Sequence, residues 1–184
     1  IIADTYFYRE NSDFKSFLDS LIESKRKYFK KFNQNKLFKF LSQEEIIIIG
    51  SLIEKEGLDN VDKRKISSVI FNRLKKNMKL QIDATVIFAI TKGQYDLKRK
   101  LLKKDLKVDD KYNTYKYKGL PIGPISLPSI GAIDAVLNYQ KHNYLFMCAK
   151  EDFSGYHNFA KNVKQHNVNA KKYRRALNDK KIKR

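Results

Sequence analysis

Residues 42–57, with the sequence SQEEIIIIGSLIEKEG, limit the fold of this chain more than any other segment. Ser42 and Glu45 match the S-x-x-E capping box that begins many helices, and Gly57 is the residue type at which helices often end. Between them, four aliphatic residues recur at the spacing of one helical face: Ile46, Ile49, Leu52 and Ile53. The segment therefore predicts a helix whose apolar face must be covered by a core.

The same helix ends on two glutamates with different expected environments. Glu56 follows Leu52 by four residues and Ile53 by three, so it lies within the apolar stripe, whereas Glu54 lies about 160° away around the helix. Desolvation on an apolar face and the negative end of the helix dipole both raise the pKa of a carboxyl group. Glu56 is therefore a candidate general acid. The alternative is a buried carboxylate paired with a cation such as Arg73.

The rest of the chain predicts further helices and one small antiparallel β element. Asn11 and Ser12 are candidate caps of a first helix, and Asp83 is a candidate cap of a short helix over residues 85–90. Three more helices are expected, over about residues 61–75, 129–140 and 163–180. A two-stranded hairpin is expected from residues 144–149 and 155–160. The predicted fold class is α+β, a helix-rich domain with a small antiparallel β element.

Four segments are expected to lie outside long regular elements. Residues 4–9 are predicted to be extended, and residues 78–82 to form a short strand or an extended link. Residues 92–111 are charged and predicted to be looped or weakly helical. Residues 112–128 contain all three prolines of the chain and are predicted to form an ordered loop with a functional role.

The composition points to an anionic partner and away from disulfide or metal chemistry. Lys and Arg number 39 against 20 acidic residues, a formal net charge of +19, which suits nucleic acid, an anionic membrane surface, an acidic polymer or simply a solvated lysine-rich surface. Cys148 is the single cysteine and is expected in the core. The three histidines lack metal-ligand spacing, so no metal and no cofactor are expected. The chain begins at Ile1, and we expect it to be a fragment of a longer protein.

Five motifs in order resemble one enzyme family, and the resemblance covers about residues 1–175. They are GSLIEKEG (50–57), VIFNRL (69–74), LQIDATVIFAI (80–90), YNTYKYKGLPIGPI (112–125), and YHNF with QHN (156–167). The family is that of the YceG-like, MltG-type endolytic peptidoglycan lytic transglycosylases. The resemblance implies a YceG-like catalytic domain over 41–184, preceded over 1–40 by an extended segment and helix that join an upstream region.

The resemblance also implies an activity and its catalytic residue. Family members are carbon–oxygen lyases that cleave the MurNAc-β-1,4-GlcNAc bond within glycan strands, leave 1,6-anhydroMurNAc ends and are thought to terminate nascent strands. Their catalytic glutamate, the second Glu of E-K-E, falls on Glu56. A single carboxyl group suffices, because it protonates the glycosidic oxygen and then takes the proton of the muramyl C6 hydroxyl that attacks C1. Unlike most glycoside hydrolases, the site needs no second catalytic carboxylate.

Substrate-binding groups are implied at nine further positions. They are Asn72, Gln81, Asp83, Thr85, Tyr112, Asn113, Tyr115, His157 and Asn167. Some have a purely structural alternative: a surface cap or an interhelical hydrogen bond for Asn72, and a helix cap for Asp83. For Tyr112, Asn113 and Tyr115 the alternative is core packing. His157, His166 and Asn167 are expected to act as scaffolding of the site rather than as metal ligands.

The implied partners and location follow from the same resemblance. Peptidoglycan glycan strands are the expected partner, peptidoglycan synthases are candidate partners, and no nucleic acid is expected. The full-length protein would be anchored in the bacterial inner membrane, with its catalytic domain on the periplasmic side.

Three rival functions remain open from the residues alone. A muramidase-type hydrolase would use Glu56 as acid and Asp83 to position water. A basic nucleic-acid-binding protein would use the interleaved lysines and aromatics of KRKYFKKF and KYNTYKYK. A pyridoxal-phosphate lyase is the third rival, although no glycine-rich phosphate loop is found.

Overall fold

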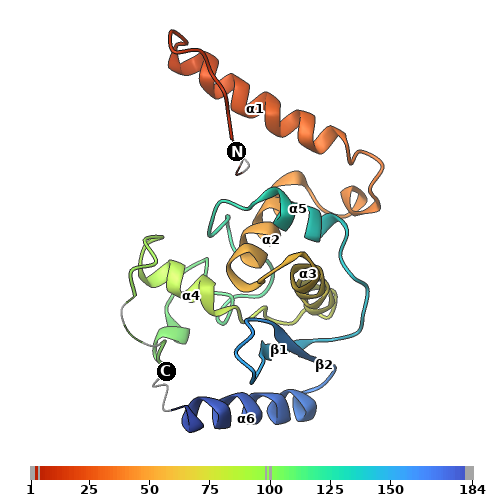
Figure 1. The fold of residues 1–184 in the computed structure, drawn as a ribbon, viewed down its shortest axis with the longest axis vertical. Coiled ribbons are helices and arrows are strands. Elements are labelled where there is room, and N and C mark those ends of the chain that lie inside the picture. The colour runs from red at the N-terminus through yellow and green to blue at the C-terminus, as the bar shows by residue number, and fades with distance from the viewer. Residues whose placement is uncertain (1–2, 4, 98, 100, 181–184) are drawn as a thin grey trace.

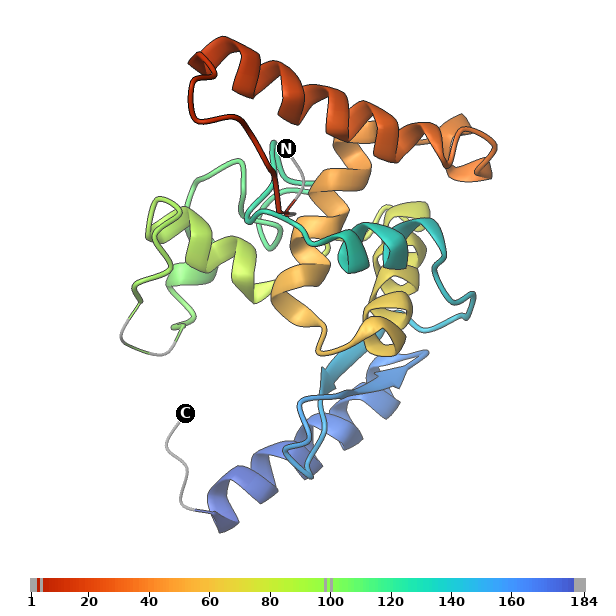
Figure 2. The same ribbon diagram turned by 45° about the horizontal axis from the view of Figure 1, so that its top comes forward.

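Three helices form the centre of the molecule in the computed structural model, which describes residues 3, 5–97, 99 and 101–180. They are α2 (Gln43–Glu56), α3 (Asn60–Lys75) and α5 (Ile130–Leu137), and they lie against one another in both views of the ribbon (Figure 1, Figure 2). The other described elements are helices α1 (Phe14–Lys30), α4 (Asp83–Ile90) and α6 (Val163–Asp179), two 3-10 helices, η1 (Lys36–Lys39) and η2 (Asp105–Lys107), and strands β1 (Phe146–Ala149) and β2 (His157–Ala160). The predicted α+β class is confirmed.

Helix α2 forms as its sequence predicts. The hydroxyl of Ser42 accepts a hydrogen bond from the backbone N–H of Glu45 at 3.1 Å, and the Glu45 carboxylate accepts one from the Ser42 N–H at 2.8 Å, which completes the capping box. All four residues of the apolar stripe are fully buried: Ile46, Ile49, Leu52 and Ile53. Ser51 on the opposite face is buried as well, because its hydroxyl accepts the N–H of Ile125 from the long loop at 3.0 Å. Helix α2 is therefore enclosed on both faces.

Gly57 follows the last residue of α2, at a position where a side chain would clash with Lys63. Its φ is −91°, so the left-handed conformation that often favours glycine at a helix end is not used. A Cβ at this position would lie 2.5 Å from Cγ and 3.2 Å from Cα of Lys63. The glycine lets α3 begin immediately after α2, which packs the two helices closely and leaves Glu56 at the point where the chain turns.

Helix α1 lies across one end of the molecule (Figure 1). Its cap is Asp13, whose carboxylate accepts the N–H of Ser16 at 2.9 Å, so the expectation of a cap at Asn11 or Ser12 is wrong. A carboxylate three residues before an open N–H also complements the positive end of the helix dipole. Near its other end, α1 contributes the buried Phe29 to the central core cluster.

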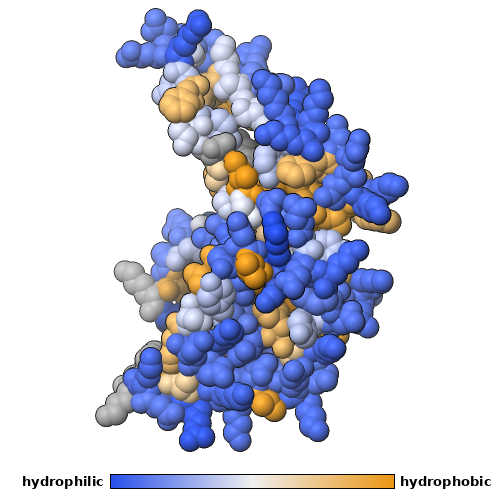
Figure 3. All heavy atoms as spheres, turned by 45° about the vertical axis from the view of Figure 1, so that its right-hand side comes forward, coloured by the Kyte–Doolittle hydropathy of each residue, from blue (hydrophilic) through white to orange (hydrophobic). Residues whose placement is uncertain are grey.

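Apolar side chains remain exposed in the first 40 residues, and Phe7, Phe14 and Phe40 are the largest examples. Figure 3 shows hydrophobic residues gathered in the recess between the top of the molecule and its body, on a face that is otherwise mostly hydrophilic. Of the segment expected to be extended over 4–9, residue 4 lies outside the described residues, and residues 5–9 form no helix or strand.

The hairpin and α6 form the end of the molecule opposite α1 (Figure 1, Figure 2). Strands β1 and β2 pair antiparallel with Phe146 opposite Ala160 and Ala149 opposite His157, as the sequence predicts. The apolar run of residues 144–149 predicts a buried strand, but all four residues of β1 are only partly buried and line a cleft. Cys148 is one of these residues and does not belong to the core. No described helix is both long enough and apolar enough to cross a membrane.

Candidate active site

A cleft of about 580 Å³ opens between α3, the hairpin and α6. Its wall comes from segments far apart in sequence, including the C-terminal residue of α2 and the start of α4. The lining residues that carry polar or aromatic groups are Glu56, Arg73, Gln81, Asp83, Tyr115, Phe146, His157, His166, Tyr173 and Arg174. The structure therefore brings together five of the ten candidate site residues of the sequence: Glu56, Gln81, Asp83, Tyr115 and His157.

Glu56 has the environment expected of a general acid. The residue is partly exposed to the cleft, yet protein atoms surround its carboxyl group, and this burial raises its pKa to about 7. The positive charge of His157 and a hydrogen bond from the Ala84 N–H oppose the rise, and the negative charge of Asp83 adds to it. Among the described residues no cation pairs with Glu56, so the alternative ion pair with Arg73 is not formed. A substantial fraction of Glu56 is therefore protonated at neutral pH.

Asp83 lies beside Glu56 at the first residue of α4. The prediction that it caps this helix is wrong, because Ile82 occupies the cap position and no side chain makes a capping hydrogen bond. The Asp83 carboxylate instead accepts a hydrogen bond from the Tyr115 hydroxyl at 2.5 Å. Burial raises the pKa of Tyr115 and the bond to Asp83 raises it further, so the phenol stays protonated as a donor.

His157 is held on the cleft wall by α3. Its Nδ1 lies 2.7 Å from a carboxylate oxygen of Asp62, which is buried in the first turn of that helix. A carboxylate on one ring nitrogen fixes the orientation of an imidazole and leaves the other nitrogen available. Gln81, on the opposite side, adopts a φ of +53° and accepts a hydrogen bond from Arg73 Nη1 at 3.2 Å through its side-chain carbonyl.

Asn72 and Thr85 do not line the cleft. The Asn72 amide donates to the carbonyl oxygens of His142 and Tyr144 at 2.7 and 2.9 Å, and so fixes the loop before the hairpin. The Thr85 hydroxyl is fully buried, donates to Ile82 O at 2.6 Å and lies 2.9 Å from the Thr114 hydroxyl. Both side chains therefore connect distant segments of the backbone.

Tyr112, Asn113 and Asn167 also lie outside the cleft lining. The Tyr112 ring packs on Phe88 with centroids 4.5 Å apart. Asn113 is fully buried, and its amide donates to two loop carbonyls at 3.1 and 2.8 Å while its oxygen accepts the N–H of Tyr115 at 2.9 Å. Asn113 therefore positions Tyr115 without reaching the cleft, and Asn167 is exposed on α6.

Several cleft residues were not proposed as site residues from the sequence. Arg73 follows Asn72 within the FNRL motif, and Tyr173 and Arg174 lie on α6. The signal that could have found the α6 residues is their spacing, since residues 166, 170, 173 and 174 recur at the period of one helical face. Nothing in the local sequence showed that this face meets the hairpin rather than solvent.

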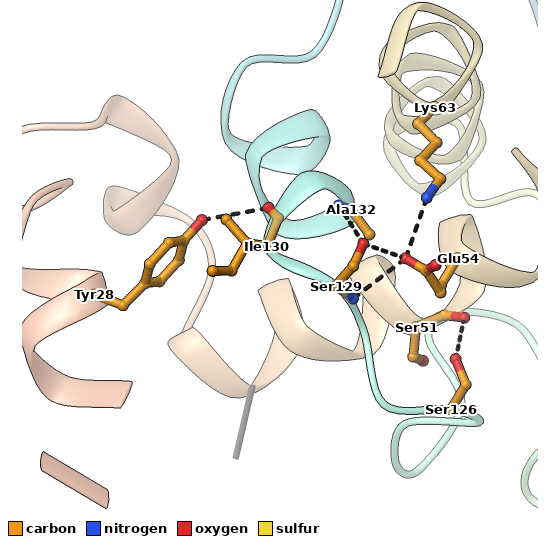
Figure 4. Close-up of polar contacts among 8 residues, drawn as sticks. All are labelled: Tyr28, Ser51, Glu54, Lys63, Ser126, Ser129, Ile130 and Ala132. Carbon is orange, nitrogen blue, oxygen red and sulfur yellow. Dashed lines mark hydrogen bonds and ion pairs between the residues drawn. The ribbon is translucent and has the colours of Figure 1, made fainter. Parts of the chain in front are cut away.

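Glu54 connects three elements on the far side of α2 (Figure 4). Its carboxylate accepts hydrogen bonds from the N–H and the hydroxyl of Ser129 at 3.2 and 2.6 Å, and its Oε2 lies 3.2 Å from Nζ of Lys63. Partial burial raises its pKa, but these hydrogen bonds and the Lys63 charge outweigh burial and leave the pKa below its ordinary value. Glu54 is thus an ionised residue that joins α2 to α3 and to the cap of α5.

Replacing Glu54 by Gln should lower the free energy of unfolding by about 1–3 kcal/mol, because hydrogen bonds to a partly buried charge are lost. Any catalytic activity at the cleft should change little. Urea unfolding followed by circular dichroism measures the first effect. Glu23→Gln is the control, since its pair with Arg26 is exposed and should change stability by less than about 0.5 kcal/mol. A well-folded Glu54→Gln variant without activity would assign Glu54 to the chemistry instead.

The fold and the cleft define a class of protein before any relative is considered: a helix-rich domain with a carboxyl group of raised pKa at an open cleft. Comparison with known proteins gives the particular family. The sequence profile of the YceG-like family matches residues 1–172, and the chain belongs to that family.

Two relatives and one solved structure agree with this assignment. An endolytic murein transglycosylase of Bacillus subtilis (strain 168) is 34% identical over 177 residues, which are 96% of this chain and 48% of the relative. An endolytic murein transglycosylase of Streptococcus pneumoniae serotype 2 is 31% identical over 166 residues, 90% of this chain and 30% of the relative. The crystal structure of a YceG-like protein from Listeria monocytogenes superposes with a TM-score of 0.75 at 34% identity and covers 89% of this chain and 52% of that one. The chain spans about half or less of these proteins.

Proposed function

We propose that this domain is an endolytic murein transglycosylase. It cleaves the MurNAc-β-1,4-GlcNAc bond inside peptidoglycan glycan strands and leaves 1,6-anhydroMurNAc ends. The observation that carries the proposal is the Glu56 carboxyl group, which faces a 580 Å³ cleft with its pKa raised to about 7. The names of the two relatives support the same substrate and reaction.

The proposed mechanism uses Glu56 twice. In its protonated form it donates to the glycosidic oxygen while positive charge develops at C1 of the muramyl residue. The resulting carboxylate then takes the proton of the muramyl C6 hydroxyl, whose oxygen attacks C1 and closes the anhydro ring. The leaving sugar keeps the first proton. The proton from the C6 hydroxyl returns Glu56 to its protonated form. Since the nucleophile belongs to the substrate, its effective concentration is high without a positioned water.

Neighbouring side chains have supporting roles in this proposal. Asp83 would stabilise positive charge at C1, and the hydrogen bond that it accepts from Tyr115 at 2.5 Å fixes its side chain. Gln81 and the free ring nitrogen of His157 would bind hydroxyl or acetamido groups of the sugars. We further propose that the cleavage terminates nascent strands, that synthases are partners, and that the domain acts on the outer side of the cytoplasmic membrane.

Digestion of purified glycan strands tests the reaction. Internal fragments with 1,6-anhydro ends are expected, and mass spectrometry distinguishes them from hydrolytic products, which are heavier by one water. The muramidase alternative remains the competing reaction, because Asp83 is exposed in the cleft beside Glu56 and could position a water. Ordinary reducing MurNAc ends would establish that alternative and contradict the transglycosylase.

A further inference from the structure

The α6 side of the cleft carries a cluster of cationic and imidazole groups that the proposed mechanism does not use. We name Arg73, His166 and Arg174 the cationic wall; all three line the cleft. Within the part of the chain that the structure describes, neither arginine forms an ion pair with an acidic side chain. The acidic residues of the lining, Glu56 and Asp83, form no ion pair with the wall among the described residues.

Arg73 is fixed in position by neutral groups only. Its Nε and Nη1 donate four hydrogen bonds, to the carbonyls of Leu145 at 2.6 Å, Lys79 at 3.0 Å and Leu80 at 2.8 Å and to the Gln81 side chain at 3.2 Å. Its Nη2 makes no hydrogen bond with any described residue, and the residue is 8% exposed. The Phe146 ring centroid also lies 5.1 Å from Cζ of Arg73. These partners offset part of the cost of burying the guanidinium, but none carries a negative charge, which a ligand can supply. Arg73 is therefore prepared to receive an anion.

His166 and Arg174 extend the wall along one face of α6. The His166 ring stacks on Phe146 with centroids 5.4 Å apart, and its Nδ1 is buried without a hydrogen-bond partner among the described residues. Burial lowers the pKa of His166, and the charges of Arg73 and Arg174 lower it further, which places both arginines near the ring. The neutral imidazole adds a polar group to the wall.

We propose that the cationic wall binds a carboxylate of the murein strand and thereby sets which sugar meets Glu56. This proposal rests on the proposed function. The two sugars of the strand have similar rings, but only the muramyl residue bears a 3-O-lactyl group. That group ends in a carboxylate where the stem peptide has been removed, and it otherwise continues into a peptide that carries carboxylates of its own. A guanidinium recognises a carboxylate through paired hydrogen bonds, so the wall distinguishes the muramyl residue from its neighbour.

Calorimetric titration of the Glu56→Gln protein with glycan strands tests the wall without turnover. Two strand preparations are used, one free of peptides and one bearing them, each before and after its carboxylates are capped as methylamides. Capping should weaken binding about tenfold in the preparation that supplies the recognised carboxylate. Adding Arg174→Gln should remove most of that difference. Arg175→Gln is the control, because Arg175 lies on the same helix, is 85% exposed and does not line the cleft.

The four titrations assign the source of the carboxylate. A capping effect confined to peptide-free strands identifies the lactyl group, and one confined to peptide-bearing strands identifies the stem peptide. Equal binding of capped and uncapped strands, or an unchanged capping effect in Arg174→Gln, would overturn the role of the wall. Cleavage of uncapped strands by the unmodified protein is measured separately, and its absence would contradict the proposed function rather than the wall.

Discussion

Replacing Glu56 by Gln should slow glycan cleavage by a factor of about 10³ or more, because the amide can neither donate a proton to the leaving oxygen nor take one from the C6 hydroxyl. Gln has nearly the same shape as Glu, so the cleft should keep its geometry. In most glycosidases one carboxyl group acts as the general acid and a second acts as the base or the nucleophile. In the proposed mechanism one carboxyl group performs both proton transfers, and no second carboxylate is proposed to replace it.

The measurement is the rate at which soluble fragments are released from purified strands, quantified by mass spectrometry. Glu44→Gln is the matched control, since Glu44 lies in the first turn of the same helix with its side chain 71% exposed, and its activity should stay within about twofold of the unchanged protein. Circular dichroism establishes that both variants are folded. Residual activity above about one tenth in Glu56→Gln would exclude Glu56 as the sole acid–base residue.

Elements with local signals were predictable from the sequence. The capping box at Ser42, the apolar stripe of α2 and the antiparallel hairpin each depend on residues that are close in sequence, and each formed as predicted. The burial of Glu56 belongs to this group too, because its place on the apolar stripe follows from its neighbours at three and four residues. The rise of its pKa to about 7 agrees with the direction expected from the helical wheel.

The roles of other polar residues depended on distant partners. Asn72 and Asn113 lie in motifs that resemble a binding site, yet their amides donate hydrogen bonds to backbone carbonyl oxygens. The periodicity of a helix or strand in the sequence does not show which carbonyl groups will lie nearby. Asp83 had a plausible local role as a cap, but the Tyr115 hydroxyl, 32 residues further along, competes for its carboxylate.

The two arginines of the cationic wall were not predicted to share a cleft, for the same reason. Arg73 comes from α3, and Arg174 comes from the last helix, so their proximity depends on how the hairpin and α6 pack against the centre. The excess of positive charge was visible in the composition, but it gave no position. A net charge of +19 describes the whole surface, whereas binding depends on the few cations that are fixed in a cleft.

The Glu56→Gln variant should also become more stable than the unchanged protein as the pH rises, by about 3 kcal/mol in total. Raising the pKa of Glu56 from an ordinary 4.5 to about 7 corresponds to this energy at 1.36 kcal/mol per unit. Below about pH 4.5 the carboxyl group is neutral in both the folded and the unfolded chain, so it adds no pH dependence. Between about pH 4.5 and 7 the unfolded chain ionises while the folded chain still holds the proton, and the folded state loses stability.

Urea unfolding of both proteins at intervals from pH 4 to pH 9 measures the effect. The difference in unfolding free energy between the variant and the unchanged protein should rise from about pH 4.5 and level off above about pH 7, because Glu56 is then ionised in both states. Other groups titrate in both proteins, so most of their contributions cancel in the difference. A difference that stays constant over this range would show that the Glu56 carboxyl group is solvated and has an ordinary pKa. The burial that destabilises the ionised group also keeps it protonated for the first step of the proposed mechanism, so the stability curve and the activity should identify the same residue.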